Sequence, residues 1–176
     1  MSLEIEQMLS PPATTDVAWR KVWGVCLTVR HRRRSMITRH MPDLGALNYI
    51  PAEAMADLGF SSVVVSDGLV FVSGVAPIQG PEFAIVGESD LGAQCAYVLD
   101  VLAKSLESVG SSPKSIVDLT VYLTGTTEIG SKYTEIAPQL ARFVGNDRPT
   151  ATAVGVTSLF LPAQQIEVRA VARVSR

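Results

Sequence analysis

The chain has 176 residues, and its 47% hydrophobic and 18% charged content is typical of a globular protein and excludes an intrinsically disordered one. Its net charge of −2 is uneven, because residues 1–40 hold seven Lys/Arg and three Asp/Glu (net +4), whereas residues 41–176 hold eight and fourteen (net −6). An acidic body does not favour contact with a phosphate backbone, so the composition argues against a nucleic-acid partner.

The cysteines and histidines are few, and their positions exclude several classes of site. Cys26 and Cys95 are too few for a disulfide framework, which predicts a reducing, cytoplasmic location. Both histidines, His31 and His40, lie in the first 40 residues. The body therefore cannot hold a Ser-His-Asp triad or a histidine metal site, and we predict no metal and no cofactor.

Residues 1–50 differ from the rest and are predicted to form a basic N-terminal extension, separate from a domain at residues 51–176. Their longest apolar stretch, residues 22–29, predicts a strand and is far shorter than the ~20 residues that cross a bilayer, so no membrane partner is expected. The basic run at residues 30–34 has the composition of a nucleic-acid or localisation patch. Two other interpretations stay open: a solvated extension without that role, and a natural start at Met36 or Met41.

The pattern becomes regular from residue 59 onward. Residues 63–65 and 69–72 predict two strands around the tight turn Asp67-Gly68. Asp90 is a predicted N-cap for a helix whose apolar residues recur every three or four positions up to Val109, with Gly110 closing it. Residues 116–124, apolar on both faces, predict a buried central strand.

The C-terminal part predicts one more helix and two more strands. An apolar stripe from Ile129 to Phe143 runs unbroken through Pro138, so we predict a helix despite the proline. Residues 150–156 and 166–174 predict the last two strands. The order β-β-α-β-α-β-β indicates an α+β domain with a mixed sheet and both helices on one face.

Alternation along the last two strands predicts which side chains share a face. One face holds Ile166, Val168, Ala170, Ala172 and Val174, and is expected to meet the helices. The opposite face holds Glu167, Arg169, Val171 and Arg173. In the preceding strand Ala151, Ala153 and Gly155 share one face, and such small residues leave room for a ligand or another chain.

Several of these segments together resemble a known family. They are Leu-Val-Phe-Val-Ser-Gly at 69–74, Asp-Arg-Pro-Thr-Ala-Thr-Ala-Val-Gly-Val at 147–156, Leu-Pro at 161–162 and Ile-Glu-Val-Arg-Ala-Val-Ala at 166–172. The chain resembles the RidA/YjgF family, also called L-PSP endoribonuclease-like, over residues 59–174. This resemblance implies a chorismate-mutase-like fold, a ring-shaped homotrimer with clefts between subunits, and hydrolysis of reactive enamines or imines to ketones and ammonia.

The resemblance also implies roles for individual residues. Glu167 falls on the glutamate of the family's Ile-Glu-x-x-Ala pattern, which helps to hold the attacking water, and Ser73 falls on the hydroxyl residue before Gly74; we predict both as catalytic. The predicted substrate-binding positions are Phe60, Gly74, Gly130, Ala151, Ala153 and Arg169. Capping of the strand end is the alternative role for Ser73.

The chain departs from the family's pattern at four of these positions. Phe60 stands where tyrosine is common, Gly130 where asparagine is frequent, Ala153 where cysteine is common, and Ala151 where the catalytic type has the arginine of Pro-x-Arg. The missing arginine matters most, because it would bind a substrate carboxylate.

Two other arginines are candidate substitutes for the missing one, Arg148 and Arg169. Arg148 is three residues from Ala151, a spacing that predicts the opposite face of the strand. Arg169 shares a face with Glu167, either as a substitute cation or as a partner in an ion pair with Glu167 at the subunit interface.

These observations support three functional hypotheses. The first is a RidA-like hydrolytic deaminase whose enamine or imine substrate, without the arginine anchor, is not a simple 2-imino acid. The second is a non-catalytic small-molecule-binding or regulatory trimer of the same fold. Ribonuclease activity ranks last, because an acidic body without histidine offers it little chemistry.

Overall fold

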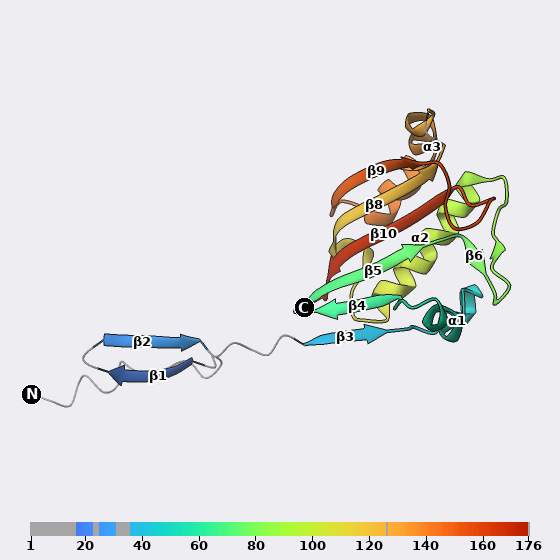
Figure 1. Ribbon diagram of the computed structural model, residues 1–176. Helices are drawn as coiled ribbons and strands as arrows, with labels where there is room; N and C mark the ends of the chain where they lie inside the picture. Colours follow the sequence, from blue (N-terminus) through green and yellow to red (C-terminus); the bar gives the residue numbers. More distant parts are fainter. Residues whose placement is uncertain (1–16, 23–24, 31–35, 126, 176) are drawn as a thin grey trace, which may run out of the picture. The chain divides into compact units, whose positions relative to one another are not determined.

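The computed structural model describes residues 17–22, 25–30, 36–125 and 127–175, and the chain divides into two units, Met1–Ser35 and Met36–Arg176. In the first unit β1 (Val17–Val22) pairs with antiparallel β2 (Val25–Arg30), from Val17↔Arg30 to Val22↔Val25 (Figure 1). The single strand predicted at residues 22–29 is therefore wrong, because Val22 ends one strand and Val25 begins its partner. Most of the basic run, residues 31–34, lies outside the described residues.

The second unit is built on a six-stranded mixed sheet in the order β3-β4-β5-β10-β8-β9 (Figure 1). All neighbouring strands are antiparallel except β8 and β9, which are parallel. The strands are β3 (Ile37–His40), β4 (Val63–Ser66), β5 (Leu69–Val75), β8 (Ile116–Thr124), β9 (Thr150–Val156) and β10 (Ile166–Arg173). The predicted turn joins β4 to β5, with Asp67 at φ 50° and Gly68 at φ 81°, the left-handed backbone that a two-residue hairpin turn needs.

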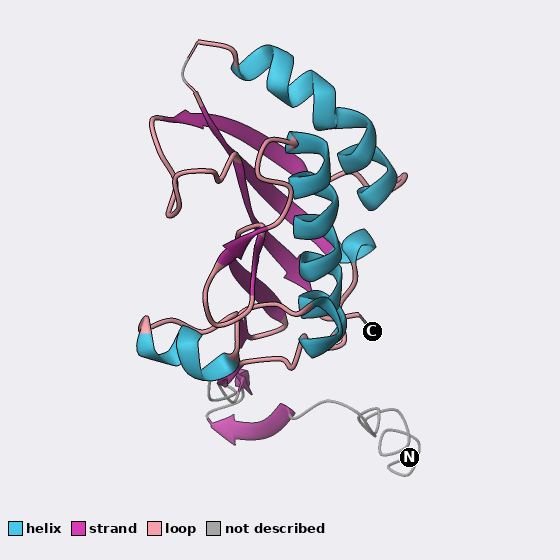
Figure 2. Ribbon diagram, turned by 90° about the vertical axis from the view of Figure 1, so that its right-hand side faces the viewer, coloured by secondary structure: helices cyan, strands magenta, loops and turns pink. Residues whose placement is uncertain are grey.

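Two long helices cover one face of this sheet (Figure 2). The helix α2 (Leu91–Glu107) begins as predicted, because Asp90 Oδ1 accepts a 2.8 Å hydrogen bond from the Ala93 amide. The helix α3 (Ile129–Val144) continues through Pro138, as its apolar stripe predicts. The α+β class and the predicted order of elements are thus confirmed.

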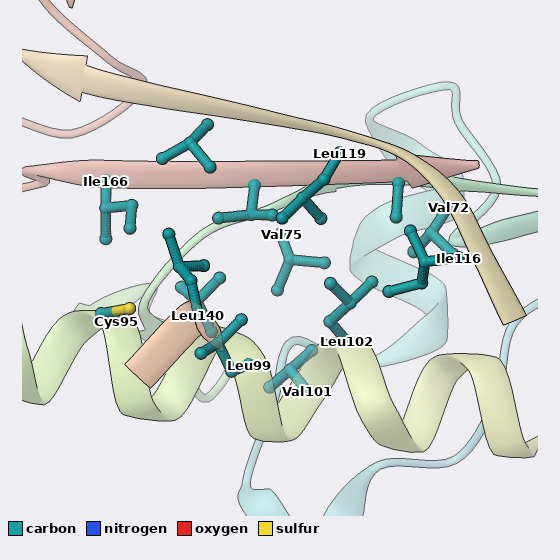
Figure 3. Packing of buried hydrophobic residues seen from close by; sticks show 14 of the residues in the cluster. Val72, Val75, Cys95, Leu99, Val101, Leu102, Ile116, Leu119, Leu140 and Ile166 are labelled. Carbon is teal, nitrogen blue, oxygen red and sulfur yellow. The ribbon is translucent and has the colours of Figure 1, made fainter. Parts of the chain in front are cut away.

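The main core lies between the sheet and these two helices. The helix-facing residues Ile166, Val168, Ala170 and Ala172 of β10 are all buried, which confirms the predicted alternation of this strand. Figure 3 shows Leu102 of α2 among sheet residues such as Ile116 and Leu119. Burial of each such aliphatic side chain contributes about 1.5–3 kcal/mol to the free energy of folding, relative to leaving it exposed to water.

The structure adds elements that the sequence pattern did not predict. These are β3 at the edge of the sheet, the short helix α1 (Ala52–Asp57), the small antiparallel pair β6 (Ile78–Gln79) and β7 (Ala84–Ile85), and the 3-10 turns Gly45–Leu47 and Pro113–Ser115. A second, smaller apolar cluster forms among them, with Ile50, Met55, Ala76 and Ile78 buried. This cluster forms part of the floor of the cavity described next.

Candidate functional site

A cavity of about 390 Å³ lies where the end of β5, the start of β10 and the segment around α1 meet. Four of the predicted site residues line it: Phe60, Ser73, Gly74 and Glu167. The other lining residues are apolar or aromatic, namely Tyr49, Ile50, Leu58, Ala76, Ile78, Phe83 and Phe160. Among these described residues Glu167 is thus the one carboxylate, in a wall that is otherwise mostly apolar.

An irregularity in the sheet brings Gly74 against Glu167. Between the pairs Val168↔Val75 and Ala170↔Val72, β5 has one residue more than β10, so Ser73 and Gly74 lie opposite a single residue. Such bulges redirect side chains locally. A Cβ placed on Gly74 would overlap Glu167 Oε1 and lie 2.9 Å from its carboxyl carbon, so only glycine leaves space for this orientation of the carboxylate.

The other carboxylate oxygen is held by a buried amide. Gln164, only 1% exposed, donates from Nε2 to Glu167 Oε2 at 3.1 Å and to the Ile166 carbonyl at 3.2 Å. Its Oε1 accepts from the Leu161 amide at 3.3 Å. Gln164 therefore fixes the carboxylate to the loop before β10, a role that the sequence analysis missed.

A second buried glutamine ties this loop to α2. Gln94, fully buried, accepts from the Gln165 amide at 2.8 Å and donates to the Ala163 carbonyl at 2.9 Å. Both ends of the Gln94 side chain thus bind the backbone on either side of Gln164. The orientation of Glu167 consequently depends on the packing of α2, far away in the sequence.

Ser73 reaches the cavity but its hydroxyl proton is engaged. Its Oγ donates to the Ser61 carbonyl at 2.7 Å, and its amide donates to the Ser62 carbonyl at 2.9 Å. This contact fits the alternative role of Ser73, which is to tie the strand end to the preceding segment. The oxygen of Ser73 remains able to accept a hydrogen bond.

Aromatic residues surround the mouth and one side of the cavity. Phe60 is 40% exposed, and Phe83 and Phe160 meet edge to face with ring centroids 6.2 Å apart. Burial raises the pKa of Tyr49 well above its usual range, with the Glu167 charge adding to this effect, so its hydroxyl stays protonated. The sequence analysis did not predict Tyr49, Phe83 or Phe160, since an aromatic residue in a loop carries no periodic signal.

The remaining predicted residues do not reach this cavity. Ala151 and Ala153 of β9 pair in register with Leu119 and Val121 of β8, which are buried under the helices, and so lie on the helix side of the sheet. Gly130 lies in the first turn of α3 with open space around it. These three positions therefore belong to a different surface of the same chain.

The room left by the small residues of β9 is filled at one end by the chain itself. A Cβ on Gly155 would overlap Ile129 Cδ1 of α3, so a helix of the same chain occupies the space that was expected to admit a ligand or partner. At the other end Ala151 and Arg148 line one cavity of about 200 Å³. Arg148 and Ala151 thus line one cavity although their odd spacing predicted opposite faces, because Arg148 precedes β9 and strand alternation does not extend to it.

Arg169 lies on the predicted face of β10 but does not meet Glu167. Among the described residues the ion pair found is Lys104–Glu107, at 2.8 Å on α2, and none joins Glu167 to Arg169. The ion-pair interpretation is therefore wrong, because the Glu167 carboxylate turns toward Gly74 and Gln164. Arg169 is exposed and does not line the cavity.

The described part of the chain offers neither a metal site nor a membrane-spanning helix. There, no three His, Cys, Asp or Glu residues are grouped as a metal ion would require. No helix within the same described residues has the length and apolar character to span a membrane. The buried thiol of Cys95 has its pKa raised to about 11 by burial, which makes it a core side chain and a poor nucleophile.

Comparisons with known proteins agree with this geometry. The model of the family Endoribonuclease L-PSP matches residues 51–174. A member of the YjgF/YER057c/UK114 family from Mycobacterium tuberculosis shares the fold at 24% sequence identity and a TM-score of 0.63, and the match covers 79% of this chain and 100% of that one. Yeast Mmf1 matches at 22% identity and a TM-score of 0.65, covering 80% of this chain and 100% of that one. A YjgF-family protein from Neisseria meningitidis matches at 22% identity and a TM-score of 0.54, covering 66% of this chain and 88% of that one. With the family model covering most of the chain, the protein belongs to the Endoribonuclease L-PSP family, the RidA/YjgF family that its sequence resembles.

Proposed function

We propose that the protein is a hydrolytic deaminase that converts a reactive enamine or imine to a carbonyl compound and ammonia. The observation that carries this proposal is the Glu167 carboxylate, which faces a 390 Å³ cavity with one oxygen bound by Gln164 and the other adjoining Gly74. A carboxylate held in this way can orient a water molecule and accept its proton.

The hydrolysis can proceed with the Glu167 carboxylate and one water molecule. The water oxygen forms a bond to the carbon of a protonated imine while Glu167 takes one water proton, and the C=N π electrons move to the nitrogen, which gives a neutral carbinolamine. Glu167 then passes its proton to the amine nitrogen. As the C–N bond breaks, the hydroxyl gives its proton to Glu167, which passes it to the departing ammonia, so that a ketone and ammonium are formed. One water is consumed, and Glu167 returns to its starting state.

The lining residues favour a substrate without an acid group. No Lys, Arg or His from the described part of the chain lines the cavity, and Ala151 takes the place of the family's arginine. A carboxylate placed next to Glu167 without a cation would be repelled. The substrate is therefore an apolar imine or enamine and not a simple 2-imino acid.

The active assembly that we propose is a homotrimer with clefts between subunits. Its support is the family resemblance together with the sheet face opposite the helices, where Ile37, Leu69, Phe71 and Val117 are 38–52% exposed. Exposed apolar residues in such numbers on one sheet face suit contact with another copy of the chain. Sedimentation equilibrium measures this directly, and a monomer at micromolar concentration would contradict it.

The test is ammonia release from short-lived imines generated in the cuvette, with acidic, neutral and aromatic examples. We expect the wild type to accelerate release from the apolar imines and Glu167→Gln to lose that acceleration. Glu135→Gln, an exposed carboxylate of α3, is the matched control and should retain it. No acceleration by the wild type with any imine would refute the proposal.

A second candidate is a non-catalytic small-molecule binder of the same fold. The engaged proton of Ser73 and the replacement of the family's arginine, asparagine and tyrosine by Ala151, Gly130 and Phe60 favour it. In that case ligands bind without turnover, and Glu167→Gln changes affinity alone.

A further inference from the structure

The charge of the cavity is carried by one side chain. Among the described residues that line it, Glu167 alone carries a formal charge at neutral pH, since Tyr49 stays protonated and the others are apolar, small or hydroxylic. A cation that approaches a negative charge beside apolar walls is attracted more strongly than it would be in water.

One oxygen of this carboxylate is available to a ligand. Oε2 accepts from Gln164, whereas Oε1 adjoins Gly74 and accepts no hydrogen bond from the described residues. The missing side chain at Gly74 makes room for Oε1 itself, on a carboxylate that lines the cavity. A ligand N–H group can therefore donate to Oε1 without displacing a protein donor.

Aromatic rings supply the second feature. Tyr49, Phe60, Phe83 and Phe160 come from three separate segments and line the same cavity. The face of an aromatic ring attracts an organic cation and repels an anion, and it also packs against an apolar group. Carboxylate and rings thus favour the same kind of ligand.

Part of this wall lies outside the segment that defines the family. Tyr49 and Ile50 precede the matched residues 51–174, and the ring of Tyr49 packs against Tyr97 with centroids 6.4 Å apart. The Tyr97 hydroxyl lies 3.0 Å from the Leu47 carbonyl oxygen and 3.1 Å from the Ile78 carbonyl oxygen, and it can donate its proton to either one. The contact with Leu47 fixes the segment before Tyr49 to the body of the domain. Tyr49 is therefore held in the cavity wall by contacts with the body of the domain.

We infer that the cavity selects apolar organic cations, namely a primary ammonium or iminium group on an aromatic or aliphatic body, and discriminates against ligands with an acid group. The inference deepens the proposed function, on which it rests for its catalytic meaning: the substrate is a protonated imine, and the balanced reaction is iminium plus water to ketone plus ammonium. Binding itself does not require turnover.

Three stable ligands of nearly equal size test the charge preference. Isothermal titration calorimetry at pH 7 compares benzylammonium, benzyl alcohol and benzoate, none of which the protein can hydrolyse. We expect benzylammonium to bind about tenfold more tightly than benzyl alcohol, and benzoate to bind least.

Two variants and one control locate the site. Glu167→Gln should remove the advantage of benzylammonium over benzyl alcohol, Phe60→Leu should weaken both, and Glu135→Gln should leave the order unchanged. Circular dichroism establishes that each variant is folded. Equal binding of benzylammonium and benzyl alcohol, preference for benzoate, or no binding of benzylammonium overturns the inference.

Ammonia release measured on the same samples separates the two proposals. Selective benzylammonium binding without hydrolysis of any imine supports the cation site and contradicts the deaminase. Hydrolysis of imines by a protein that prefers benzoate has the opposite meaning, since the deaminase then stands and the cation site does not.

Discussion

The contact between Gly74 and Glu167 can be tested without knowing the substrate, through the substitution Gly74→Ala. Gly74 is not among the residues with positive φ, so alanine is compatible with its backbone. The new methyl group would overlap Glu167 Oε1 and lie 2.9 Å from Cδ and 3.2 Å from Cγ. The nearest obstacle is thus the end of a flexible side chain, and we expect the carboxylate to swing away while the backbone stays in place.

The expected loss of stability in Gly74→Ala follows from the contacts that the Glu167 carboxylate loses. Glu167 loses its 3.1 Å hydrogen bond from Gln164, and a hydrogen bond to a charged group contributes about 1.5–3 kcal/mol. Glycine-to-alanine substitution offsets about 0.4–1 kcal/mol of this by restricting the unfolded chain. The free energy of unfolding should therefore fall by about 1–2 kcal/mol.

Urea denaturation of a double-mutant cycle isolates the contact. In the Glu167→Ala background the methyl group meets no carboxylate, so Gly74→Ala should be neutral or slightly stabilising there, which gives a coupling of about 1–3 kcal/mol. Gly130→Ala is the matched control: nothing lies within 4 Å of its added Cβ, and alanine in a helix should stabilise by up to about 1 kcal/mol. Equal effects of Gly74→Ala in both backgrounds would refute the placement of Glu167 over Gly74.

Three further predictions concern the surroundings of the site. Gln164→Met keeps the side-chain volume but removes the side-chain partner of the buried Ile166 carbonyl and of the partly buried Leu161 amide, and it frees Glu167. Urea denaturation should therefore show a loss of about 2–4 kcal/mol. Burial raises the pKa of Cys95 from its usual 9.0 to about 11, so the thiol ionises at lower pH in the unfolded chain than in the folded one, and the folded protein should lose stability as the pH rises from 9 to 11. In thermal melts across this range, the Cys95→Ala variant should lose less stability than the wild type between pH 9 and 10. Asp90→Ala removes the 2.8 Å hydrogen bond to the Ala93 amide and should cost about 1 kcal/mol by urea denaturation, whereas Asp90→Asn should cost little.

The parts of the fold that were predicted correctly are those with strong local signals. The stripes of α2 and α3, the Asp67-Gly68 turn and the alternation of β10 each follow from side chains that face one core. The edge strand β3 has no such signal, because its four residues alternate between exposed and half-buried and are fixed by pairing with β4. The six residues of α1 are too few to show a helical period.

The site was predicted only in part, for a related reason. Glu167, Ser73, Gly74 and Phe60 share one cavity, as the resemblance implied. The orientation of the small residues of β9 depends on its parallel register with β8, and a strand that alternates threonine with alanine does not reveal which side faces the core. Gln164 was missed because its importance arises from burial next to Glu167, and burial of a loop glutamine cannot be deduced from composition.

The contacts of the Glu167 carboxylate differ from those of a glutamate that only faces solvent. A glutamate on an exposed strand face needs no particular neighbours, since water satisfies both of its oxygens. Here Oε1 has room only because Gly74 lies opposite it. Oε2 is bound by the side-chain amide of Gln164, which is 1% exposed and lies in a loop that Gln94 binds to α2. Each of these features would be unnecessary for a carboxylate that only faced solvent, and together they hold it toward an apolar cavity. The arrangement is the kind that chemistry at a polarised C–N bond requires, a carboxylate of fixed direction in a site with little competing charge.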